Sequence, residues 1–333
     1  MPTLDEVLAR RPGQFRFHEL LPNDSGADTP TLGEGATPTL RALALGDAVW
    51  VKDESQNPTG SFKARGMAVA LSRNIELGAT RFHLPSNGNA GAAAAVYAAL
   101  HGARVRVAVP ANTPEPLVEM PRLAGAEVMT VEGTIADAAS SLPAGDGWFS
   151  LATLGEPYRV EGKKMMGYEI FWDLGRLPDV IFYPTGGGTG LVGMAKAFDE
   201  MEVLGWIGAE RPRIVSVQVD SCAPIVRAFH AGAETAEPWA DPGETTAYGL
   251  RVPSAIGDRL MLSALRATGG TGVAVTEAEV AEGTFRLASE TGILGSPEGG
   301  ACLAAYRRLL DDGWLTFDDQ VVLFNTGAAA NYW

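Results

Sequence analysis

Residues 57–66 read Asn57-Pro-Thr-Gly-Ser-Phe-Lys63-Ala-Arg-Gly66. The Pro-Thr-Gly triplet predicts a turn, and the residues after it predict a helix with Lys63 just inside its first turn. Desolvation and nearby dipoles lower the pKa of an amine, and the neutral amine is the form that attacks a carbonyl. Most lysines on helices are surface residues. Lys63 is a candidate nucleophile because further segments of the sequence also carry binding motifs.

On both sides of this stretch, short β-branched runs alternate with helical patterns. The predicted strands are 49–52, 81–84, 105–109, 127–131, 179–183, 214–219, 272–275 and 321–324. The predicted helices are 62–74, 90–101, 115–124, 161–174, 191–202, 223–231, 277–291 and 299–310. This alternation predicts an α/β fold with open, mainly parallel twisted sheets and flanking helices.

Three glycines and one capping pair support these boundaries. Gly78, Gly102 and Gly125 each follow a predicted helix, where a positive φ is favoured. Thr276 and Glu279 predict a capping box at the start of the 277–291 helix. The stretch 143–147, Pro-Ala-Gly-Asp-Gly, is the best candidate for a crossover between domains, and 233–249 is rich in loop residues.

Composition restricts the class of partner. The formal net charge of −14 argues against nucleic acid and against an anionic membrane surface. Cys222 and Cys302 form no CxxC pair, so no zinc or redox motif is readable. The N-terminal residues are too polar for a signal peptide, and the apolar run 90–100 is too short to span a bilayer. We expect a soluble, cytoplasmic protein without a metal site.

Two glycine-rich turns each follow a predicted strand and precede a predicted helix. Residues 86–91 read Ser-Asn-Gly-Asn-Ala-Gly, and 185–190 read Thr-Gly-Gly-Gly-Thr-Gly. Main-chain N–H groups at such helix starts attract anions, and small residues allow close approach. The second turn fits neither the Rossmann fingerprint nor a Walker A loop, yet three successive glycines suit a phosphate. The first turn could simply use Gly and Asn for their conformational tolerance.

Three further positions carry candidate polar groups. Thr326 follows the last strand, at the carboxyl end where ligands bind in open α/β sheets, although threonine is common at strand ends. Glu298 stands at a helix start, where the helix dipole alone would favour a carboxylate. Arg159, Lys163 and Lys164 form a cationic cluster in an acidic chain, and this suggests a second anion site rather than a solvated face.

Taken together, the segments resemble the pyridoxal-5′-phosphate (PLP) enzymes of the tryptophan synthase β family, fold type II, and among these most closely threonine synthase. The N-P-T-G-S-F-K, S-x-G-N, T-G-G-G-T-G, P-Y-R-x-E-G-K-K and P-E-G segments occur in the family's order. The resemblance implies an active site between a small domain, 36–148, and a large domain made of 1–35 and 149–333. It also suggests a homodimer.

The resemblance also implies roles for individual residues. Lys63 matches the catalytic lysine that forms a Schiff base with the cofactor, and Asn89 matches the asparagine that hydrogen-bonds its phenolic O3′. Thr326 matches the hydroxyl partner of the pyridine nitrogen. By the same resemblance, the residues expected to bind the cofactor phosphate are those of the glycine loop, namely Thr185, Gly186, Gly187, Gly188 and Thr189. The residues expected to bind the substrate are Ser86, Asn87, Gly88, Arg159, Lys163, Lys164 and Glu298.

The implied reaction converts O-phospho-L-homoserine and water into L-threonine and phosphate, so the partner is a small phosphorylated amino acid. A serine/threonine dehydratase has the same cofactor and lysine but needs no second phosphate site, so the cationic cluster favours threonine synthase. The residues after Gly327 read Ala-Ala-Ala-Asn-Tyr-Trp333, unlike the Gly-Leu-Lys-Tyr-like segment of threonine synthases. This difference keeps β-replacement on an activated serine open. A non-catalytic domain of the same fold is disfavoured by the retained motifs.

Overall fold

The computed structural model describes residues 3–333 except 87, 134, 144 and 146, and these residues form two compact units. The first unit comprises the residues up to Ala36, Asn57–Met165 and Ala330–Trp333, and the second comprises Thr37–Gln56 and Met166–Ala329. The stretch 143–147, where the sequence predicts a crossover, belongs to the first unit, although two of its residues lie outside the described ones. The small domain 36–148 and the large domain made of 1–35 and 149–333 stay a prediction.

The first unit contains a four-stranded parallel sheet in the order β5-β4-β3-β6. Its strands are β3 (Arg81–Pro85), β4 (Arg104–Pro110), β5 (Glu127–Val131) and β6 (Phe149–Ser150). Its helices are α1 (Leu4–Leu8), α2 (Lys63–Glu76), α3 (Asn89–Leu100), α4 (Glu115–Leu123) and α5 (Ile135–Ser140), with 3₁₀ turns η1 (Gln14–Leu20) and η2 (Gly26–Asp28). The small side chains Ala92–Ala95 are fully buried and let α3 pack closely against α2, α4 and β4.

The second unit contains a six-stranded sheet in the order β1-β2-β10-β7-β8-β9, in which only the β1–β2 pair is antiparallel. Its strands are β1 (Thr39–Arg41), β2 (Val49–Asp53), β7 (Val180–Pro184), β8 (Arg213–Val219), β9 (Thr271–Val275) and β10 (Val321–Asn325). Every residue of β7 and β10 is buried, as expected for parallel strands covered on both faces.

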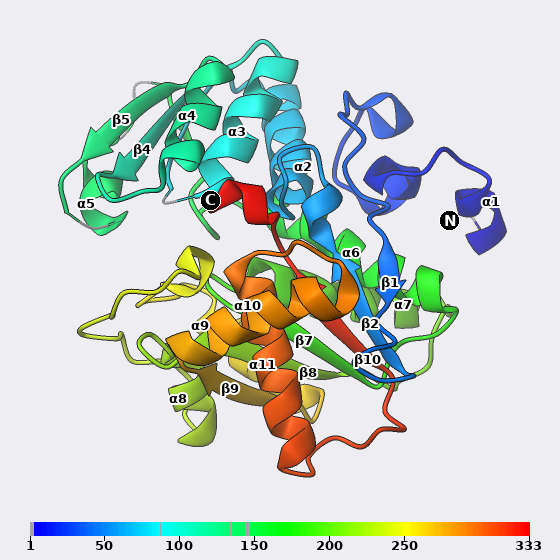
Figure 1. Ribbon diagram of the computed structural model, residues 1–333. Coiled ribbons are helices and arrows are strands. Elements are labelled where there is room, and N and C mark those ends of the chain that lie inside the picture. The colour runs from blue at the N-terminus through cyan, green and yellow to red at the C-terminus, as the bar shows by residue number, and fades with distance from the viewer. Residues whose placement is uncertain (1–2, 87, 134, 144, 146) are drawn as a thin grey trace. The chain divides into compact units, whose positions relative to one another are not determined.

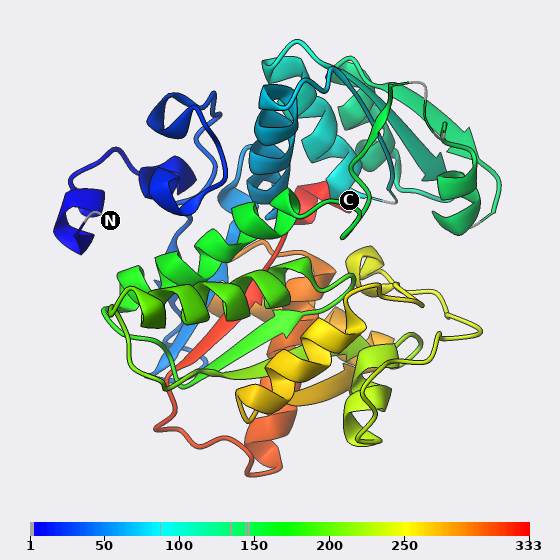
Figure 2. The ribbon, with the colours of Figure 1, turned by 180° about the vertical axis from the view of Figure 1, so that it is seen from behind.

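Helices cover both faces of this sheet. Figure 1 shows α10 (Glu277–Thr291) and α11 (Pro297–Asp311) on one face, and Figure 2 shows α7 (Thr189–Val203) and α9 (Asp258–Ala267) on the other. The remaining elements are α8 (Pro224–His230) and the 3₁₀ turns η3 (Glu54–Gln56), η4 (Tyr248–Leu250) and η5 (Ala329–Asn331). Helix α6 (Tyr158–Leu174) begins in the first unit and ends in the second. None of the described helices combines the length and apolar character needed to cross a membrane.

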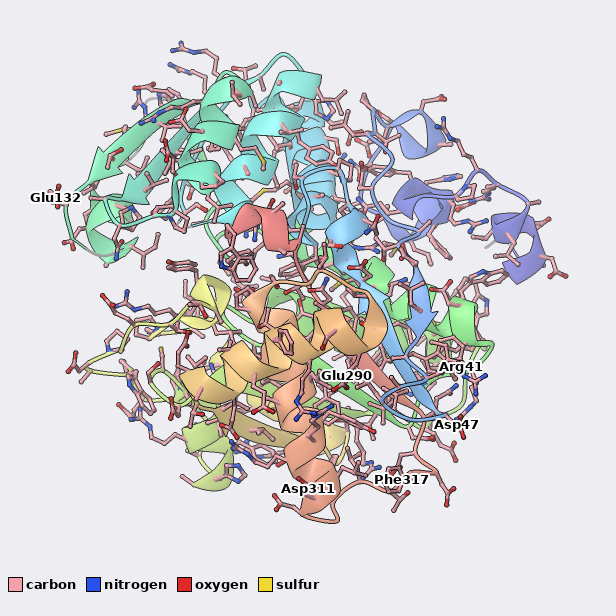
Figure 3. The ribbon with its side chains drawn as sticks, in the orientation of Figure 1. Arg41, Asp47, Glu132, Glu290, Asp311 and Phe317 are labelled. Atoms are coloured by element: carbon pink, nitrogen blue, oxygen red, sulfur yellow. The ribbon has the colours of Figure 1, made fainter. Side chains whose placement is uncertain are left out.

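The α/β prediction is confirmed, and all eight predicted strands and all eight predicted helices are present with end shifts of a few residues. Gly78, Gly102 and Gly125 have positive φ, and the Thr276–Glu279 capping box forms. The sequence prediction missed β1, β6, α1, α5 and α9. Strand β1 has only three residues, and its turn into β2 is closed by the Arg41 guanidinium, which donates to the Asp47 carbonyl at 2.8 and 3.1 Å (Figure 3).

Candidate active site

Lys63 is the first residue of α2, directly after the predicted turn. In that turn Gly60 has φ +65°, and its N–H donates to the Asn57 carbonyl at 2.8 Å. Lys63 is half-buried, and its Nζ lies 4.4 Å from the centre of the Phe62 ring. The turn therefore places the amine at a helix start with one side against an aromatic face.

A glycine pair brings α2 into main-chain contact with the first turns of α6. A Cβ on Gly162 would lie 2.0 Å from the Arg65 carbonyl oxygen, and a Cβ on Gly66 would lie 2.9 Å from the Arg159 carbonyl oxygen. Both positions therefore need glycine. Because of this close crossing, the Lys163 Nζ reaches the Phe62 ring at 4.9 Å, so two lysine amines contact one aromatic side chain.

The predicted cationic cluster lies on this part of α6. Arg159 is buried, and one of its guanidinium nitrogens donates to the Leu151 carbonyl at 2.6 Å. Its Nε is buried and has no hydrogen-bond partner among the described residues. Lys164 instead forms an ion pair with Glu161 at 2.6 Å, so its charge is locally compensated. Arg159 is therefore the stronger candidate for an anion.

The burial of these cations changes their protonation. The pKa of Lys163 is lowered well below its ordinary value, first by desolvation and then by the charges of Arg159 and Lys63, while Glu156 acts in the opposite sense. Desolvation also lowers the pKa of Arg159 and raises that of Glu156. The Glu156 carboxylate accepts the N–H of Tyr158 at 2.7 Å at the start of α6. An incoming anion would stabilise the charged form of Lys163.

The Ser86–Gly91 turn joins β3 to α3, as predicted. The Ser86 hydroxyl accepts the N–H groups of Gly88 and Gly91 at 3.2 and 2.9 Å, so it shapes the turn and the first turn of α3. Asn87 lies outside the described residues. Asn89 opens α3, and its side-chain amide contacts Asn331 at 2.6 Å and the Tyr332 hydroxyl at 3.2 Å.

In the second unit, the Thr185–Thr189 turn joins β7 to α7. In the described part of the chain, the N–H groups of Gly186, Gly187 and Gly188 donate to no main-chain carbonyl, so they remain available at a helix start. A Cβ on Gly186 would lie 2.0 Å from the Gly249 carbonyl oxygen. Gly188 has φ +76°, and a Cβ there would meet Met261. Packing therefore requires glycine at positions 186 and 188.

The two threonines that flank this loop differ. The Thr185 hydroxyl donates to the Tyr183 carbonyl at 3.0 Å and the residue is fully buried, so its side chain fixes the strand end. Thr189 is the first residue of α7 and is also buried.

Thr326 lies between two anchored neighbours at the end of β10. The Asn325 side chain donates to Asp53 at 2.8 Å and accepts the Ser296 N–H at 3.1 Å. The same Ser296 N–H also donates to the Gly327 carbonyl at 2.9 Å. The Thr326 backbone is therefore held from both sides.

Glu298 lies in the first turn of α11 and holds the η4 turn. Its Oε1 accepts the Gly249 N–H at 2.8 Å, and the Gly249 carbonyl is the group that packs on Gly186. The Oε2 atom is buried and, among the described residues, has no hydrogen-bond partner, as is also true of the Ser296 hydroxyl. Glu298 thus supports the glycine loop through its main-chain neighbour and keeps one acceptor unused.

A family model described as pyridoxal-phosphate dependent enzyme matches residues 30–327 of this chain. The chain belongs to this family of pyridoxal-phosphate-dependent enzymes. Threonine synthases of Methanosarcina acetivorans and Methanocaldococcus jannaschii are each 33% identical to it, over 97% of this chain and 81% and 82% of their own lengths. The structure of threonine deaminase isoform 2 from Solanum lycopersicum superposes with a TM-score of 0.77 and 19% identity, covering 98% of this chain and 90% of that one, which shows the shared fold.

The residues of this pyridoxal-phosphate-dependent enzyme fit the cofactor. The glycine loop offers unpaired amides without Cβ atoms for a phosphate, and Lys63 offers an amine against an aromatic ring. Ser296 and Glu298 add buried polar atoms that, in the described ranges, lack a partner. These are donor and acceptor types that a phosphorylated, polar aromatic cofactor requires.

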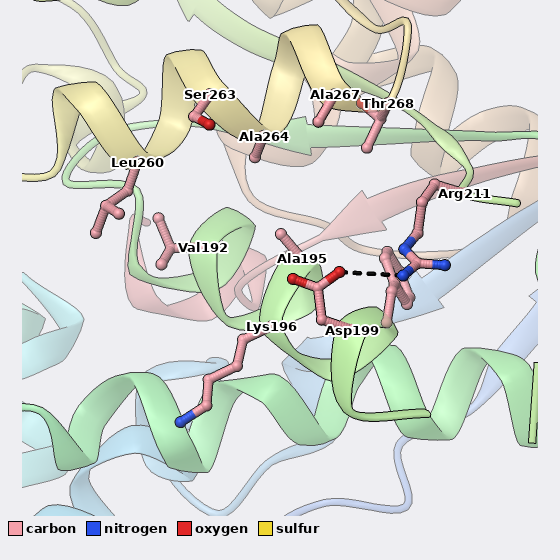
Figure 4. A pocket seen from close by; sticks show the side chains of 11 residues that line it. Val192, Ala195, Lys196, Asp199, Arg211, Leu260, Ser263, Ala264, Ala267 and Thr268 are labelled. Carbon is pink, nitrogen blue, oxygen red and sulfur yellow. Dashed lines mark hydrogen bonds and ion pairs between the residues drawn. The ribbon is translucent and has the colours of Figure 1, made fainter. Parts of the chain in front are cut away.

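A groove between α7 and α9 is separate from these groups. It is lined by residues such as Val192, Leu260 and Ser263, and the Arg211 guanidinium at its rim is paired with Asp199 at 3.1 Å (Figure 4). None of the predicted site residues lines it, so we assign it no catalytic role.

Sequence reasoning missed several supporting residues of the enzyme. The Gly66–Gly162 pair could have been suspected, because an isolated glycine inside a helical pattern often marks a close approach. Asn325 could also have been singled out, because it is a polar residue at the end of an apolar strand. Asn331 had no local signal, because its partner Asn89 lies 242 residues away in the sequence.

Proposed function

We propose that this enzyme is a threonine synthase that converts O-phospho-L-homoserine and water into L-threonine and phosphate. The observation that carries the proposal is its similarity to two proteins named threonine synthase, 33% identical over 97% of the chain. The buried cations Arg159 and Lys163 support a phosphorylated substrate.

The cofactor contacts are assigned residue by residue. Lys63 would hold the cofactor covalently through its amine, and the Asn89 amide would donate to the phenolic oxygen. The Thr326 hydroxyl would bond the ring nitrogen. The amides of Gly186–Gly188 and the start of α7 would hold the phosphate, flanked by Thr185 and Thr189. When bound, the cofactor acts as an electron sink for the carbon atoms next to the substrate amine.

Lys63 is the residue we propose to move protons at Cα and Cβ of the substrate. A general base must be neutral to accept a proton, and its pKa is best close to the working pH. Because Lys63 and Lys163 contact the same Phe62 ring in a partly desolvated place, repulsion between their charges favours a neutral amine on one of them. The pKa that this repulsion lowers is that of Lys163, so the assignment of the proton-accepting amine to Lys63 rests on the family resemblance.

The γ-phosphate of the substrate is assigned to Arg159 and Lys163, together with Lys164. The unpaired Nε of Arg159 is a donor with no competing partner in the described chain, and it suits a phosphate oxygen. The substrate carboxylate is assigned to the start of α3, with Ser86, Asn87 and Gly88. Glu298 is also assigned to the substrate, because its buried Oε2 has no hydrogen-bond partner among the described residues.

A neutral partner at the ring nitrogen has a chemical consequence. The Thr326 hydroxyl carries no charge, so it cannot fix a full positive charge there as a carboxylate would. We therefore expect the positions of Lys63 and of the bound phosphate, more than the ring, to decide which proton moves.

The rival functions are a serine/threonine dehydratase and a β-replacement enzyme acting on an activated serine. The test is parallel incubation of the holoenzyme with O-phosphohomoserine, O-phosphoserine, threonine and serine, with assays for inorganic phosphate, keto acid and threonine. The proposal expects phosphate and threonine from O-phosphohomoserine alone. Keto acid from threonine or serine, without phosphate release from O-phosphohomoserine, would overturn it.

We further propose that the enzyme works as a homodimer in the cytoplasm, on the basis of the family resemblance and of cysteine usage. The described Cys222 and Cys302 are both buried thiols, which suits a reducing compartment. Light scattering on the eluting protein would test the dimer through its mass.

A further inference from the structure

We propose that Asn331 is a positioning residue for cofactor binding, because it fixes the orientation of the Asn89 amide so that the nitrogen is the atom left to donate. This inference rests on the proposed role of Asn89 and adds a residue to which no motif assigned a function. Asn331, Tyr332 and Asn89 all belong to the first unit.

The contacts of Asn331 connect two predicted site segments. Its Nδ2 donates one N–H to the Asn89 Oδ1 at 2.6 Å, and its other N–H is shared between the carbonyl oxygens of Thr59 and Gly60, both at 3.3 Å. Asn331 is only 5% exposed, so these bonds form away from competing water. One side chain therefore ties the turn before Lys63 to the residue that opens α3.

The orientation of the two side-chain amides follows from which of their partner atoms donate and which accept a hydrogen bond. Main-chain carbonyls only accept, so the Asn331 atom that faces Thr59 and Gly60 must be its nitrogen. That nitrogen can only donate, so the Asn89 atom it meets must be the oxygen. The Asn89 nitrogen is consequently directed elsewhere, and a flipped Asn89 would place two NH₂ groups against each other.

Tyr332 completes the arrangement. The Asn89 Nδ2 donates one N–H to the Tyr332 hydroxyl at 3.2 Å. An amide nitrogen carries two hydrogens, so one N–H remains for the phenolic oxygen of the cofactor. Asn331 thus acts through the Asn89 oxygen, and Tyr332 through the Asn89 nitrogen.

The test measures the affinity of the apoenzyme for PLP by titration of the visible absorbance, together with the melting temperature of each apo variant. Asn331→Asp keeps the size of the side chain but replaces the donor by a carboxylate that repels the three oxygens. Asn331→Ala removes the donor without adding charge, and it serves if the first variant does not fold. Each is expected to weaken PLP binding about tenfold, as for the loss of one buried hydrogen bond.

A double-mutant cycle with Asn89→Ala separates positioning from general stabilisation. If Asn331 acts through Asn89, Asn331→Ala changes the PLP affinity clearly less in the Asn89→Ala background than in the unmodified enzyme. Asn74→Ala is a matched control, because Asn74 is a buried asparagine of the same unit whose Nδ2 bonds the Ala70 carbonyl at 2.7 Å. It should lower the melting temperature and leave the PLP affinity unchanged.

Two results would overturn the inference, and they differ in what else they affect. If Asn89→Ala leaves the PLP affinity unchanged, both the proposed role of Asn89 and this inference are wrong. If Asn89→Ala weakens binding but the Asn331 variants do not, or weaken it equally in both backgrounds, only the inference is wrong.

Discussion

The two units offer the proposed cofactor and substrate different kinds of group. The first unit uses charged side chains, with Lys63, Lys163 and Arg159 on the crossing of α2 and α6. The second unit uses main-chain amides, with Gly186–Gly188 ahead of α7, and a neutral hydroxyl on Thr326. The groups of the first unit depend on their protonation state, and those of the second depend on the absence of side-chain volume. A change in pH should therefore affect the first unit most, and an added methyl group should affect the second.

This difference follows from the packing in each unit. In the first unit, glycines lie beside the candidate groups, because Gly66 and Gly162 bring two helices together and Lys163 lies in a desolvated place at their crossing. In the second unit, we propose that the glycines themselves are the functional groups, and their missing Cβ atoms make room for Gly249 and Met261. The same residue type therefore serves packing in both units, and we assign it a role in recognition in only one.

The largest expected effect comes from Lys63→Ala. Removing the amine removes both the covalent link and the proton carrier, so kcat should fall by about 10⁴-fold or more. Steady-state assays of phosphate release measure it. Lys196→Ala, at a half-exposed lysine of α7, is the control and should retain activity. Near-normal turnover in Lys63→Ala would refute the assignment.

The second effect concerns volume in the second unit. Gly186→Ala places a methyl group against the Gly249 carbonyl, so the free energy of unfolding should drop by about 1–3 kcal/mol, with weaker PLP binding. Urea denaturation measures the stability. Gly208→Ala is the control, because a Cβ there meets nothing within 4 Å. Equal stability of the two variants would show that the loop is not tightly packed.

The third effect concerns protonation in the first unit. Because the folded chain lowers the pKa of Lys163, the unfolded chain binds more protons between that pKa and about 10.4, the ordinary lysine value. Stability of the unmodified enzyme should therefore rise with pH across this window.

Lys163→Met should remove this dependence. The variant should be more stable near neutral pH by about 1–2 kcal/mol, with a gain that shrinks toward pH 10, and should show a raised KM for the phosphorylated substrate. Unfolding curves at several pH values measure the first effect, and initial rates measure the second. A gain in stability that does not vary with pH would contradict the protonation argument.

The smallest effect is expected at Thr326. Thr326→Val keeps the shape and removes the hydroxyl, so PLP affinity should fall by about 1 kcal/mol, roughly fivefold. Thr276→Ala removes the capping box of α10 and should cost about 1 kcal/mol of stability without changing PLP affinity. If the two variants bind PLP equally well, the hydroxyl has no part in cofactor binding.

Local patterns predicted much of this fold. Short β-branched runs located the eight longest strands, and glycines such as Gly78 and Gly125 located helix ends, where the structure gives them positive φ. Helix α9 was missed, although Met261, Leu262 and Leu265 lie on its buried side, because Gly257 at its N-cap provides no side-chain cap. Strand β6 has two residues, too few for any period.

The sequence predicted the candidate site as a set of motifs, but not the contacts among them. The Lys63 turn, the Asn89 turn and the glycine loop all lie at helix starts, where strand–turn–helix patterns placed them. Long-range contacts needed the structure, as with Gly162 on Arg65 and Asn331 on Asn89. These depend on how distant segments pack, which no local period records.

We propose above all that the amine of Lys63 bonds covalently to the cofactor. The most direct test of this bond is borohydride reduction of the holoenzyme, followed by proteolysis and mass spectrometry to locate the modified lysine. We predict that the reduced cofactor is attached to Lys63. Attachment to Lys163 or Lys164 instead, or a protein that takes up PLP without any covalent adduct, would contradict the account.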